Sequence, residues 1–328
     1  MWFLGKTMIS VYITAKIPKE GIELLKKKGF QVEVNNSDKN LSARELKEIF
    51  SKFDAVLTLM TDKIDEETLA AASGRLKIIA NYATGFDNID VLAAKRRGVV
   101  VTNTPVSGQA VAEHAFSLIL ACAKRIVEAD RFVRTGKFTR WDPMAFLSGQ
   151  VAGQTIGIIG LGRIGASVGR IAYDGFGMKI LYHDIDRFQD FELLTDAKLV
   201  SLFELLSVAD VITLSVPLTF STRHLIGKRE LELMKNSAIL INVSRGVVVD
   251  EAALIWALST KKIAAAGLDV FENEPNIPHE LLTLSNVVFT PHIASATFET
   301  RISMAKIAAQ NIIDVFEGKT PFGIIKVS

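Results

Sequence analysis

The sequence predicts an α/β protein made of two doubly wound domains, one of them inserted in the other. Its 328 residues are enough for two domains of roughly 150 residues each. Two long series of short apolar runs alternate with amphipathic segments, a pattern typical of parallel strands joined by helices. A last amphipathic segment has no strands of its own, which indicates that the chain returns to its first domain.

The first series occupies about the first hundred residues. Its expected strands are 10–17, 30–34, 55–60, 76–80 and 99–102. Helices are expected over 18–28 and from Ser42, Asp65 and Ile89 onward. Asn103-Thr104-Pro105 then interrupts the pattern, and one long, alanine-rich helix is expected from Ser107 to about Thr135.

The second series predicts strands at 155–161, 179–183, 211–216, 238–243, 263–269 and 287–290. Six strands with intervening helices fit one doubly wound domain. A final helix over 297–317 is expected to pack back on the first domain. The expected division is therefore 1–104 with 296–328 for one domain and 105–295 for the other.

Composition excludes several classes of protein. The chain is 49% hydrophobic and 23% charged, which is typical of a globular protein and not of a disordered one. A net charge of +2 provides no surplus for tracking phosphates, so we expect no nucleic-acid partner. The apolar stretch 115–123 is far shorter than the ~20 residues of a membrane span. One Cys and no signal-peptide pattern in residues 1–6 favour a cytoplasmic protein, which could equally start at Met8.

A glycine-rich turn follows the first strand of the second series. It reads Gly160-Leu161-Gly162-Arg163-Ile164-Gly165, a G-x-G-x-x-G between a strand and a helix. Gly160 allows the tight turn, Gly162 lets the backbone approach a pyrophosphate, and Gly165 lets the helix pack on the strand. The diphosphate would lie at the helix N-terminus, where free N–H groups and the helix dipole favour an anion. We therefore predict a Rossmann dinucleotide site and not merely a flexible turn.

Asp184 ends the next strand, about 20 residues after the turn. Its carboxylate could accept hydrogen bonds from the adenosine ribose and would repel a 2′-phosphate, so NAD is the expected cofactor. Arg187 could in principle pair with such a phosphate, but a solvated surface charge is the preferred interpretation.

Three polar segments, 241–246, 267–275 and 290–297, follow later strands of the second series. They carry Arg245, the acids Asp269 and Glu274, and His292. Ligands of open α/β sheets bind outside the carboxyl ends of the strands, so these groups should converge on the cofactor. An Arg that binds a carboxylate, a His that donates a proton and an acid that orients the His suit hydride transfer to a keto acid. Each residue alone would more often be a surface ion pair, a loop charge or a turn residue.

With these motifs the sequence resembles the D-isomer-specific 2-hydroxyacid dehydrogenase family over nearly its whole length. Within the family it is most similar to the glyoxylate/hydroxypyruvate reductase branch. The motifs that carry the resemblance are 81–90 (NYATGFDNID), the glycine turn, Ser244-Arg245-Gly246, 267–271 (GLDVF) and Pro291-His292. The resemblance implies a Rossmann cofactor domain inserted in a flavodoxin-like substrate domain.

The resemblance also implies roles for individual residues. Arg245 would bind the substrate carboxylate and keto group, His292 would donate the proton, and Glu274 would be its carboxylate partner. Asp269 would hold the nicotinamide carboxamide, and the amides of Thr84 and Gly85 would cradle the substrate carboxylate. The remaining cofactor contacts would come from Val216, Pro217, Thr222, Val243 and Ser244.

The family likeness further implies a homodimer formed through the cofactor domain. The alanine-rich helix over 107–135 and the loop of Trp141 are the expected contacts, and Trp141 would narrow the partner's site for small substrates. No spacing of His, Cys and carboxylates predicts a metal site. We expect His114, with Glu113 nearby, to be a packed and hydrogen-bonded histidine of the long helix. His183 should adjoin Asp184, His224 and His279 should be surface residues, and Cys122 should belong to the core.

The residues after His292 distinguish members of the family. The aromatic pair that D-lactate dehydrogenases usually carry soon after this His is missing. Formate dehydrogenases pair their His with an amide, whereas Glu274 is an acid. The extra regulatory domain of large phosphoglycerate dehydrogenases is not expected. D-lactate or phosphoglycerate specificity nevertheless remains open, as do the physiological direction and some use of NADP. An NAD-sensing corepressor on the same scaffold is a further alternative, although its disordered tails are not apparent, and a Rossmann methyltransferase would lack the Arg–Glu–His set.

Overall fold

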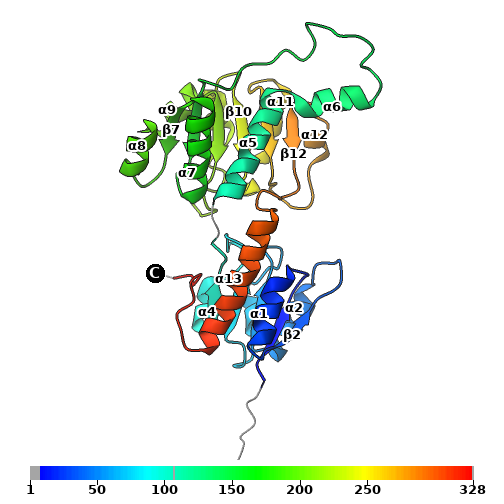
Figure 1. Cartoon of the computed structure of the whole chain (residues 1–328), viewed down its shortest axis with the longest axis vertical. Helices are drawn as coiled ribbons and strands as arrows, with labels where there is room; N and C mark the ends of the chain where they lie inside the picture. Colours follow the sequence, from blue (N-terminus) through cyan, green and yellow to red (C-terminus); the bar gives the residue numbers. More distant parts are fainter. Residues whose placement is uncertain (1–7, 106–107, 327–328) are drawn as a thin grey trace, which may run out of the picture. The chain divides into compact units, whose positions relative to one another are not determined.

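The computed structural model describes residues 8–105 and 108–326 of the chain. They fold into two compact units, which we describe separately (Figure 1). Unit 1 contains the residues up to 105 and those from Thr297 on, and unit 2 contains residues 108–296. We expected these divisions after residues 104 and 295. Residues 1–6 and Ser107, which entered the sequence predictions, lie outside the described residues.

Unit 1 is built on a five-stranded sheet in which every pairing is parallel. Its strands are β1 (Ser10–Ile13), β2 (Gln31–Val34), β3 (Ala55–Thr58), β4 (Ile78–Asn81) and β5 (Val100–Thr102). The order β2-β1-β3-β4-β5 is the flavodoxin-like arrangement, which confirms the fold predicted for this part of the chain. Strands β1 and β3 end earlier than predicted, because apolar residues continue into the loops after them. Strands β2 and β5 start one residue later than predicted, and β4 lies one or two residues further along the chain.

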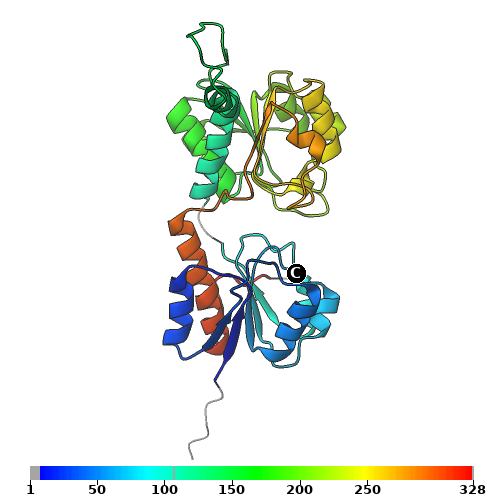
Figure 2. The same cartoon turned by 90° about the vertical axis from the view of Figure 1, so that its right-hand side faces the viewer.

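Helices cover both faces of this sheet (Figure 2). They are α1 (Lys19–Lys27) and α13 (Phe298–Phe316) on one face, with α2 (Ala43–Lys52), α3 (Glu66–Ala70) and α4 (Val91–Arg96) on the other. Ser42 and Asp65, at which helices were predicted to start, are the N-caps of α2 and α3. Their side chains accept the backbone N–H of the third helical residue, which is why the helices begin there.

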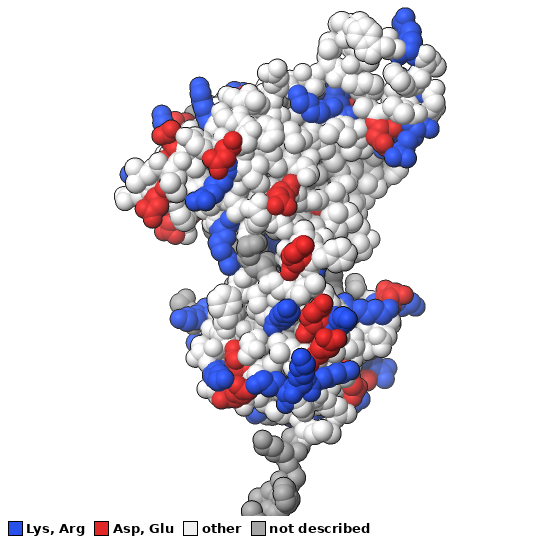
Figure 3. Space-filling model, in the orientation of Figure 1, with Lys and Arg blue, Asp and Glu red and all other residues white. Residues whose placement is uncertain are grey.

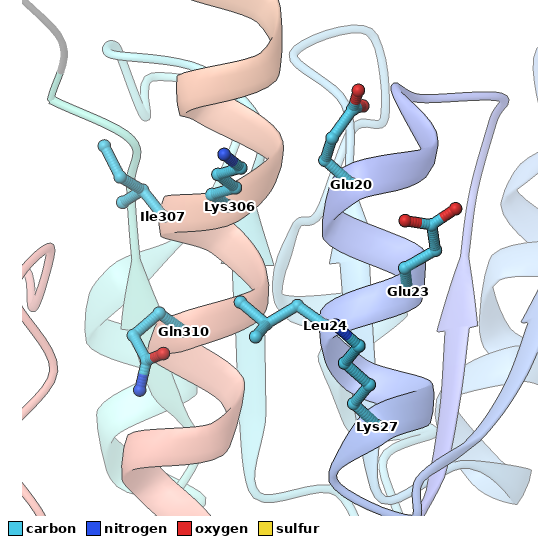
Figure 4. Close-up of a pocket in the computed structure, with 7 residues that line it drawn as sticks. All are labelled: Glu20, Glu23, Leu24, Lys27, Lys306, Ile307 and Gln310. Atoms are coloured by element: carbon cyan, nitrogen blue, oxygen red, sulfur yellow. The ribbon is translucent and has the colours of Figure 1, made fainter.

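Helices α1 and α13 lie side by side although 270 residues or more separate them in the sequence (Figure 4). A Cβ atom at Gly21 would lie 2.6 Å from the carbonyl oxygen of Ala305, so the close contact requires a glycine. The groove beside this contact is lined by side chains of both charges, including Glu20, Glu23, Lys27 and Lys306.

Unit 2 is built on a seven-stranded parallel sheet in the order β12-β11-β10-β9-β6-β7-β8. Its strands are β6 (Thr155–Ile159), β7 (Lys179–His183), β8 (Lys198–Leu199), β9 (Val211–Leu214), β10 (Ile239–Asn242), β11 (Ala265–Leu268) and β12 (Val287–Phe289). This is the Rossmann order with one added strand. The prediction of six strands missed β8, because two exposed residues at a sheet edge leave no periodic pattern.

Helices also cover both faces of the second sheet. One layer contains α5 (Gln109–Ala123) and α7 (Arg163–Arg170), and the other contains α9 (Leu202–Val208), α10 (Lys228–Leu233) and α11 (Glu251–Ser259). Two further helices, α8 (Gln189–Thr195) and α12 (His279–Leu282), lie in connections between strands.

The prediction of one helix from Ser107 to Thr135 is wrong, because the chain breaks between α5 and α6 (Ile126–Arg134). Arg125 has a φ of 52°, in the left-handed region that ends a helix. Its guanidinium bonds to Glu128 and lies 5.2 Å from the ring centre of Phe146, contacts that hold the bend. Helix α6 and the following loop project from the body of unit 2 (Figures 1 and 2).

The described surface is mixed in charge. Acidic and basic side chains are interspersed on the face shown in Figure 3. Among the described residues, no helix is both long enough and apolar enough to cross a membrane.

Candidate active site

The glycine turn has the geometry that a dinucleotide requires. Gly160 has a φ of 89°, and a Cβ atom there would lie 2.8 Å from Cγ1 of Val216. A Cβ at Gly165 would lie 2.1 Å from the carbonyl oxygen of Gly160, so α7 can pack here only through a glycine. At Gly162, by contrast, a Cβ would meet no described heavy atom within 4 Å. The space beside Gly162 is where a pyrophosphate can approach the backbone.

Helix α7 begins directly after Gly162, and no side chain caps it. Arg163 and Ile164 form its first turn, whose N–H groups have no intrahelical acceptor. Helix α7 therefore presents its positive end to the open space beside Gly162.

Asp184 is joined to the glycine turn by a hydrogen bond. Its Oδ2 accepts from the amide of Leu161 at 2.7 Å, and its Oδ1 accepts from the amide of Asp186 at 3.1 Å. Each oxygen retains a lone pair that a ribose hydroxyl could use. The guanidinium of Arg187 is exposed, as expected for a surface charge, and it bonds to Glu192.

The segment after β9 lies against the glycine turn. Val216 touches the turn at Gly160, and the hydroxyl of Thr222 donates to the carbonyl oxygen of Pro217 at 2.7 Å. The hydroxyl oxygen of Ser215 is buried and has no partner among the described residues, a group that the sequence did not single out. Together with the open helix end and Asp184, these residues fit a dinucleotide.

Asn242 holds the turn that carries Arg245. Its Oδ1 accepts from both the amide and the hydroxyl of Ser244, and its Nδ2 donates to the carbonyl oxygen of Arg245 at 2.9 Å. Val243 and Ser244 are buried, and Nη1 of Arg245 donates to the carbonyl oxygen of Ser244. Sequence reasoning did not single out Asn242, whose only signal was a polar side chain within the apolar strand predicted over 238–243; in the structure it is the last residue of β10.

Gly246 brings the Arg245 turn against the loop that carries Glu274. A Cβ atom at Gly246 would lie 1.9 Å from the carbonyl carbon of Phe271 and 2.4 Å from the amide nitrogen of Glu272. Only a glycine allows the two backbones to approach so closely. The structure thus brings the Arg245 turn next to the loop that carries Glu274.

His292 and Glu274 form a hydrogen-bonded pair. Nδ1 of His292 lies 2.8 Å from Oε2 of Glu274, and Oε1 of Glu274 accepts from the amide of Phe271 at 3.0 Å. His292 has a φ of 55°, a conformation that costs roughly 1 kcal/mol for a residue with a side chain. Its amide donates to the carbonyl oxygen of Asp269 at 2.8 Å, which helps to hold that conformation.

The carboxylate of Asp269 holds the loop of His292 through hydrogen bonds. Its buried carboxylate accepts from the hydroxyl of Thr290 at 2.6 Å and from the amides of Ile293 and Ala294 at 2.8 Å each. Burial alone would raise the pKa of Asp269, but these bonds and His114 outweigh it and hold the pKa below its usual value. Oδ2 accepts from the amide of Ala294 and retains a lone pair, so the implied contact with the nicotinamide carboxamide stays a prediction.

His114 is a packed, hydrogen-bonded histidine, as expected. Its Nε2 lies 2.9 Å from the hydroxyl of Thr290 and 3.3 Å from Oδ1 of Asp269. Glu113, its neighbour in the helix, bonds instead to Gln109, because adjacent helical residues point to different sides.

Thr84 and Gly85 follow β4 in unit 1. Asn103 donates to the carbonyl oxygen of Thr84 at 2.6 Å, and Asn81 donates to that of Gly85 at 3.0 Å. We find no acceptor for the amides of Thr84 and Gly85 among the residues that the structure describes. The carbonyls are thus fixed while the amides can bind an anion.

His183, His224 and Cys122 make structural contacts. His224 is partly exposed and bonds to Glu272 at 2.9 Å, and Nδ1 of His183 contacts the carbonyl oxygen of Val200. Cys122 is buried, and burial raises the pKa of its thiol to about 12. Over residues 8–105 and 108–326, no three His, Cys, Asp or Glu residues are grouped to hold a metal ion.

The fold and these groups define a dinucleotide-dependent oxidoreductase. Residues 116–294 match the family model described as the D-isomer specific 2-hydroxyacid dehydrogenase, NAD binding domain. The chain belongs to the D-isomer-specific 2-hydroxyacid dehydrogenase family, as predicted, and its cofactor is NAD.

Individual relatives agree with the family. A glyoxylate reductase of Thermococcus gammatolerans is 48% identical over 95% of this chain and 94% of its own length. A crystal structure from Thermus thermophilus superimposes with a TM-score of 0.90 at 38% identity, covering 97% of this chain and all of that one. A structure of the glyoxylate/hydroxypyruvate reductase of Sinorhizobium meliloti superimposes with a TM-score of 0.85 at 32% identity and covers 97% of both chains. That enzyme is described as NADPH-dependent and is in complex with NADP and malonate.

Proposed function

We propose that this protein is an NAD(H)-dependent reductase of small 2-keto acids, of the glyoxylate or hydroxypyruvate type. The observation that carries the proposal is the His292–Glu274 pair, in which the loop of Glu274 packs against the Arg245 turn, within a unit that binds NAD. The names of the relatives, glyoxylate reductases at 46–48% identity, support this substrate class.

The nicotinamide, when bound, supplies the hydride. Glu274 as a carboxylate can only accept, so Nδ1 of His292 carries the proton between them. The other ring nitrogen, Nε2, is then the atom from which His292 gives a proton to the carbonyl oxygen. Arg245 offers a planar fork for the substrate carboxylate, and its charge stabilises the oxygen as it becomes negative.

The substrate must carry a carboxylate next to its carbonyl. The amides of Thr84 and Gly85 would bind that carboxylate in unit 1, and Asp184 would bind the adenosine ribose in unit 2. The direct test is an assay of NADH oxidation with glyoxylate, hydroxypyruvate, pyruvate and longer 2-keto acids. Turnover of glyoxylate or hydroxypyruvate above the others is expected, and no turnover of any 2-keto acid would refute the proposal.

We also propose that the protein acts as a homodimer in the cytoplasm. Several large apolar side chains on α6 and the loop after it are exposed, among them Val133, Phe138, Trp141, Met144 and Leu147. An apolar, projecting segment of this size is typical of an interface. Sedimentation at micromolar concentration is expected to give a dimer, and Trp141→Ala to weaken it, whereas a monomeric wild type would contradict the proposal.

A further inference from the structure

Asp62 closes a turn directly after β3 in unit 1. Its amide donates to the carbonyl oxygen of Leu59 at 3.1 Å, and its Oδ2 accepts from the amide of Leu59 at 2.8 Å. The side chain of Asp62 is 4% exposed, although Thr61 beside it is exposed. A buried carboxylate thus fixes the backbone of residues 59–61 from the inside.

The same carboxylate oxygen also binds the neighbouring strand. The hydroxyl of Thr14, just beyond β1, donates to it at 2.5 Å. Burial raises the pKa of Asp62, and the hydrogen bonds from Thr14 and Leu59 only partly oppose this. Strands β1 and β3 are adjacent at the point where the strand order reverses, which is where ligands of doubly wound sheets bind.

Asn88 connects this turn to the segment after β4. Its Nδ2 donates to the carbonyl oxygens of Leu59 at 3.1 Å and Asp62 at 2.9 Å. Its Oδ1 accepts from Nδ2 of Asn81 at 3.1 Å, and that same amide group donates to the carbonyl oxygen of Gly85. One side chain therefore sets the spacing between the 59–61 turn and the Thr84–Gly85 amides.

We propose that Asp62 and Asn88 are positioning residues that set which 2-keto acid side chains the protein accepts. The inference rests on the proposed function, in which the Thr84 and Gly85 amides bind the carboxylate. All 2-keto acids share that carboxylate and differ in the group beyond the carbonyl. A rigid turn held at a fixed spacing from the carboxylate site limits the size of that group.

The test compares glyoxylate, which has no side chain, with the bulky 2-oxoisocaproate. Asp62→Ala removes the carboxylate that accepts hydrogen bonds from Leu59 and Thr14. We expect the ratio of kcat/KM for glyoxylate to that for 2-oxoisocaproate to fall about tenfold. This change is the equivalent of one lost charge-assisted hydrogen bond. The change should appear in KM, with kcat and the NADH dissociation constant unaltered. Asp62→Asn keeps an acceptor oxygen and should recover most of the selectivity.

Two further variants make the test specific. Asn88→Asp keeps the acceptor for Asn81 but places an oxygen against two carbonyls, so the same loss of selectivity is expected. Asn36→Ala, at an exposed asparagine of unit 1, is the matched control. Thermal unfolding measurements establish whether each variant folds. If Asp62→Ala does not fold, the ratio of kcat/KM for the two keto acids is measured in Thr14→Val and Asn88→Asp instead.

The outcomes separate the two proposals. In one outcome the wild type reduces glyoxylate while the folded variants keep its ratio of kcat/KM for glyoxylate to that for 2-oxoisocaproate within about twofold. This result overturns the inference and leaves the proposed function standing. An equal loss for every substrate also overturns it, because only general binding would have changed. A wild type inactive on all 2-keto acids overturns both.

Discussion

Oε2 of Glu274 lies 2.8 Å from Nδ1 of His292, while Oε1 of the same carboxylate accepts from the amide of Phe271. Both oxygens of Glu274 are therefore held, and the ring of His292 is oriented by a group that cannot rotate freely. A fixed acceptor on Nδ1 leaves Nε2 for the substrate. The same arrangement predicts how each partner should respond to substitution.

Replacement of His292, the proposed proton donor, should slow the chemical step. His292→Ala is expected to lower kcat by about 10²–10⁴, the usual value of general acid catalysis, with little change in NADH affinity. Steady-state kinetics and a fluorescence titration with NADH measure the two quantities. A variant with near wild-type rates would refute the role of His292.

Replacement of the carboxylate should lower the rate less than removal of the imidazole. Glu274→Gln keeps a hydrogen-bonding group beside Nδ1 of His292 but loses the negative charge. We expect kcat to fall by less than in His292→Ala, with NADH affinity unchanged. A kcat equal to that of the wild type would show that the charge of Glu274 does not assist His292.

The shape of the guanidinium should matter as well as its charge. Arg245→Lys keeps the positive charge and removes the planar fork, so KM for the keto acid should rise more than kcat falls. NADH affinity serves as the internal control. An unchanged KM would show that the fork does not bind the carboxylate.

Asp184 should select the cofactor. Its carboxylate would face the 2′-phosphate of NADP, so we expect a preference for NAD of at least about tenfold, or ~1.4 kcal/mol. Asp184→Ala should reduce the ratio of kcat/KM for the two cofactors, whereas Arg187→Ala should not, because Arg187 is paired with Glu192. Comparable values for NADH and NADPH in the wild type would contradict this prediction.

Asp269 should stabilise unit 2 in a pH-dependent manner. Its pKa in the folded protein lies below the ordinary value of an aspartate, about 3.9. Its contribution to stability is therefore present above about pH 4 and is lost as the pH falls through the lowered pKa. Asp269→Asn turns an N–H group toward donors, and the free energy of unfolding at pH 7 should fall by at least about 2 kcal/mol.

Urea unfolding between pH 3 and pH 7 measures the effect of Asp269→Asn. The difference from the wild type should narrow below pH 4. Asp190→Asn, at an exposed position of unit 2, is the control and should change little. A difference that is independent of pH would mean that the charge of Asp269 does not contribute.

Much of the candidate site could be predicted because its parts are contiguous in the chain. The glycine turn connects β6 to α7 within a few residues, so the steric need for Gly160, Gly162 and Gly165 follows from local geometry alone. The helix starts at Ser42 and Asp65 were equally predictable, since an N-cap bonds to a backbone group three residues away.

Features without a local signal were missed. No Gly or Pro marks the end of α5, and the break at Arg125 depends on the contact of its guanidinium with Phe146 in a distant loop. The edge strand β8 is too short for any periodicity. The roles of Asn242 and Asp62 depend on side-chain bonds that the residue types permit but do not specify.

The sequence by itself determined the family, the two α/β units and the choice of His292 and Glu274 as candidates, because motifs and alternating periodicity lie along the chain. Only the tertiary structure decided the partners of each side chain. His114 bonds to Thr290, 176 residues away, and not to the adjacent Glu113. The reason is physical: packing of α5 against β11 and β12 brings one face of that helix to the Asp269 carboxylate, and no local preference of the chain encodes which face it is.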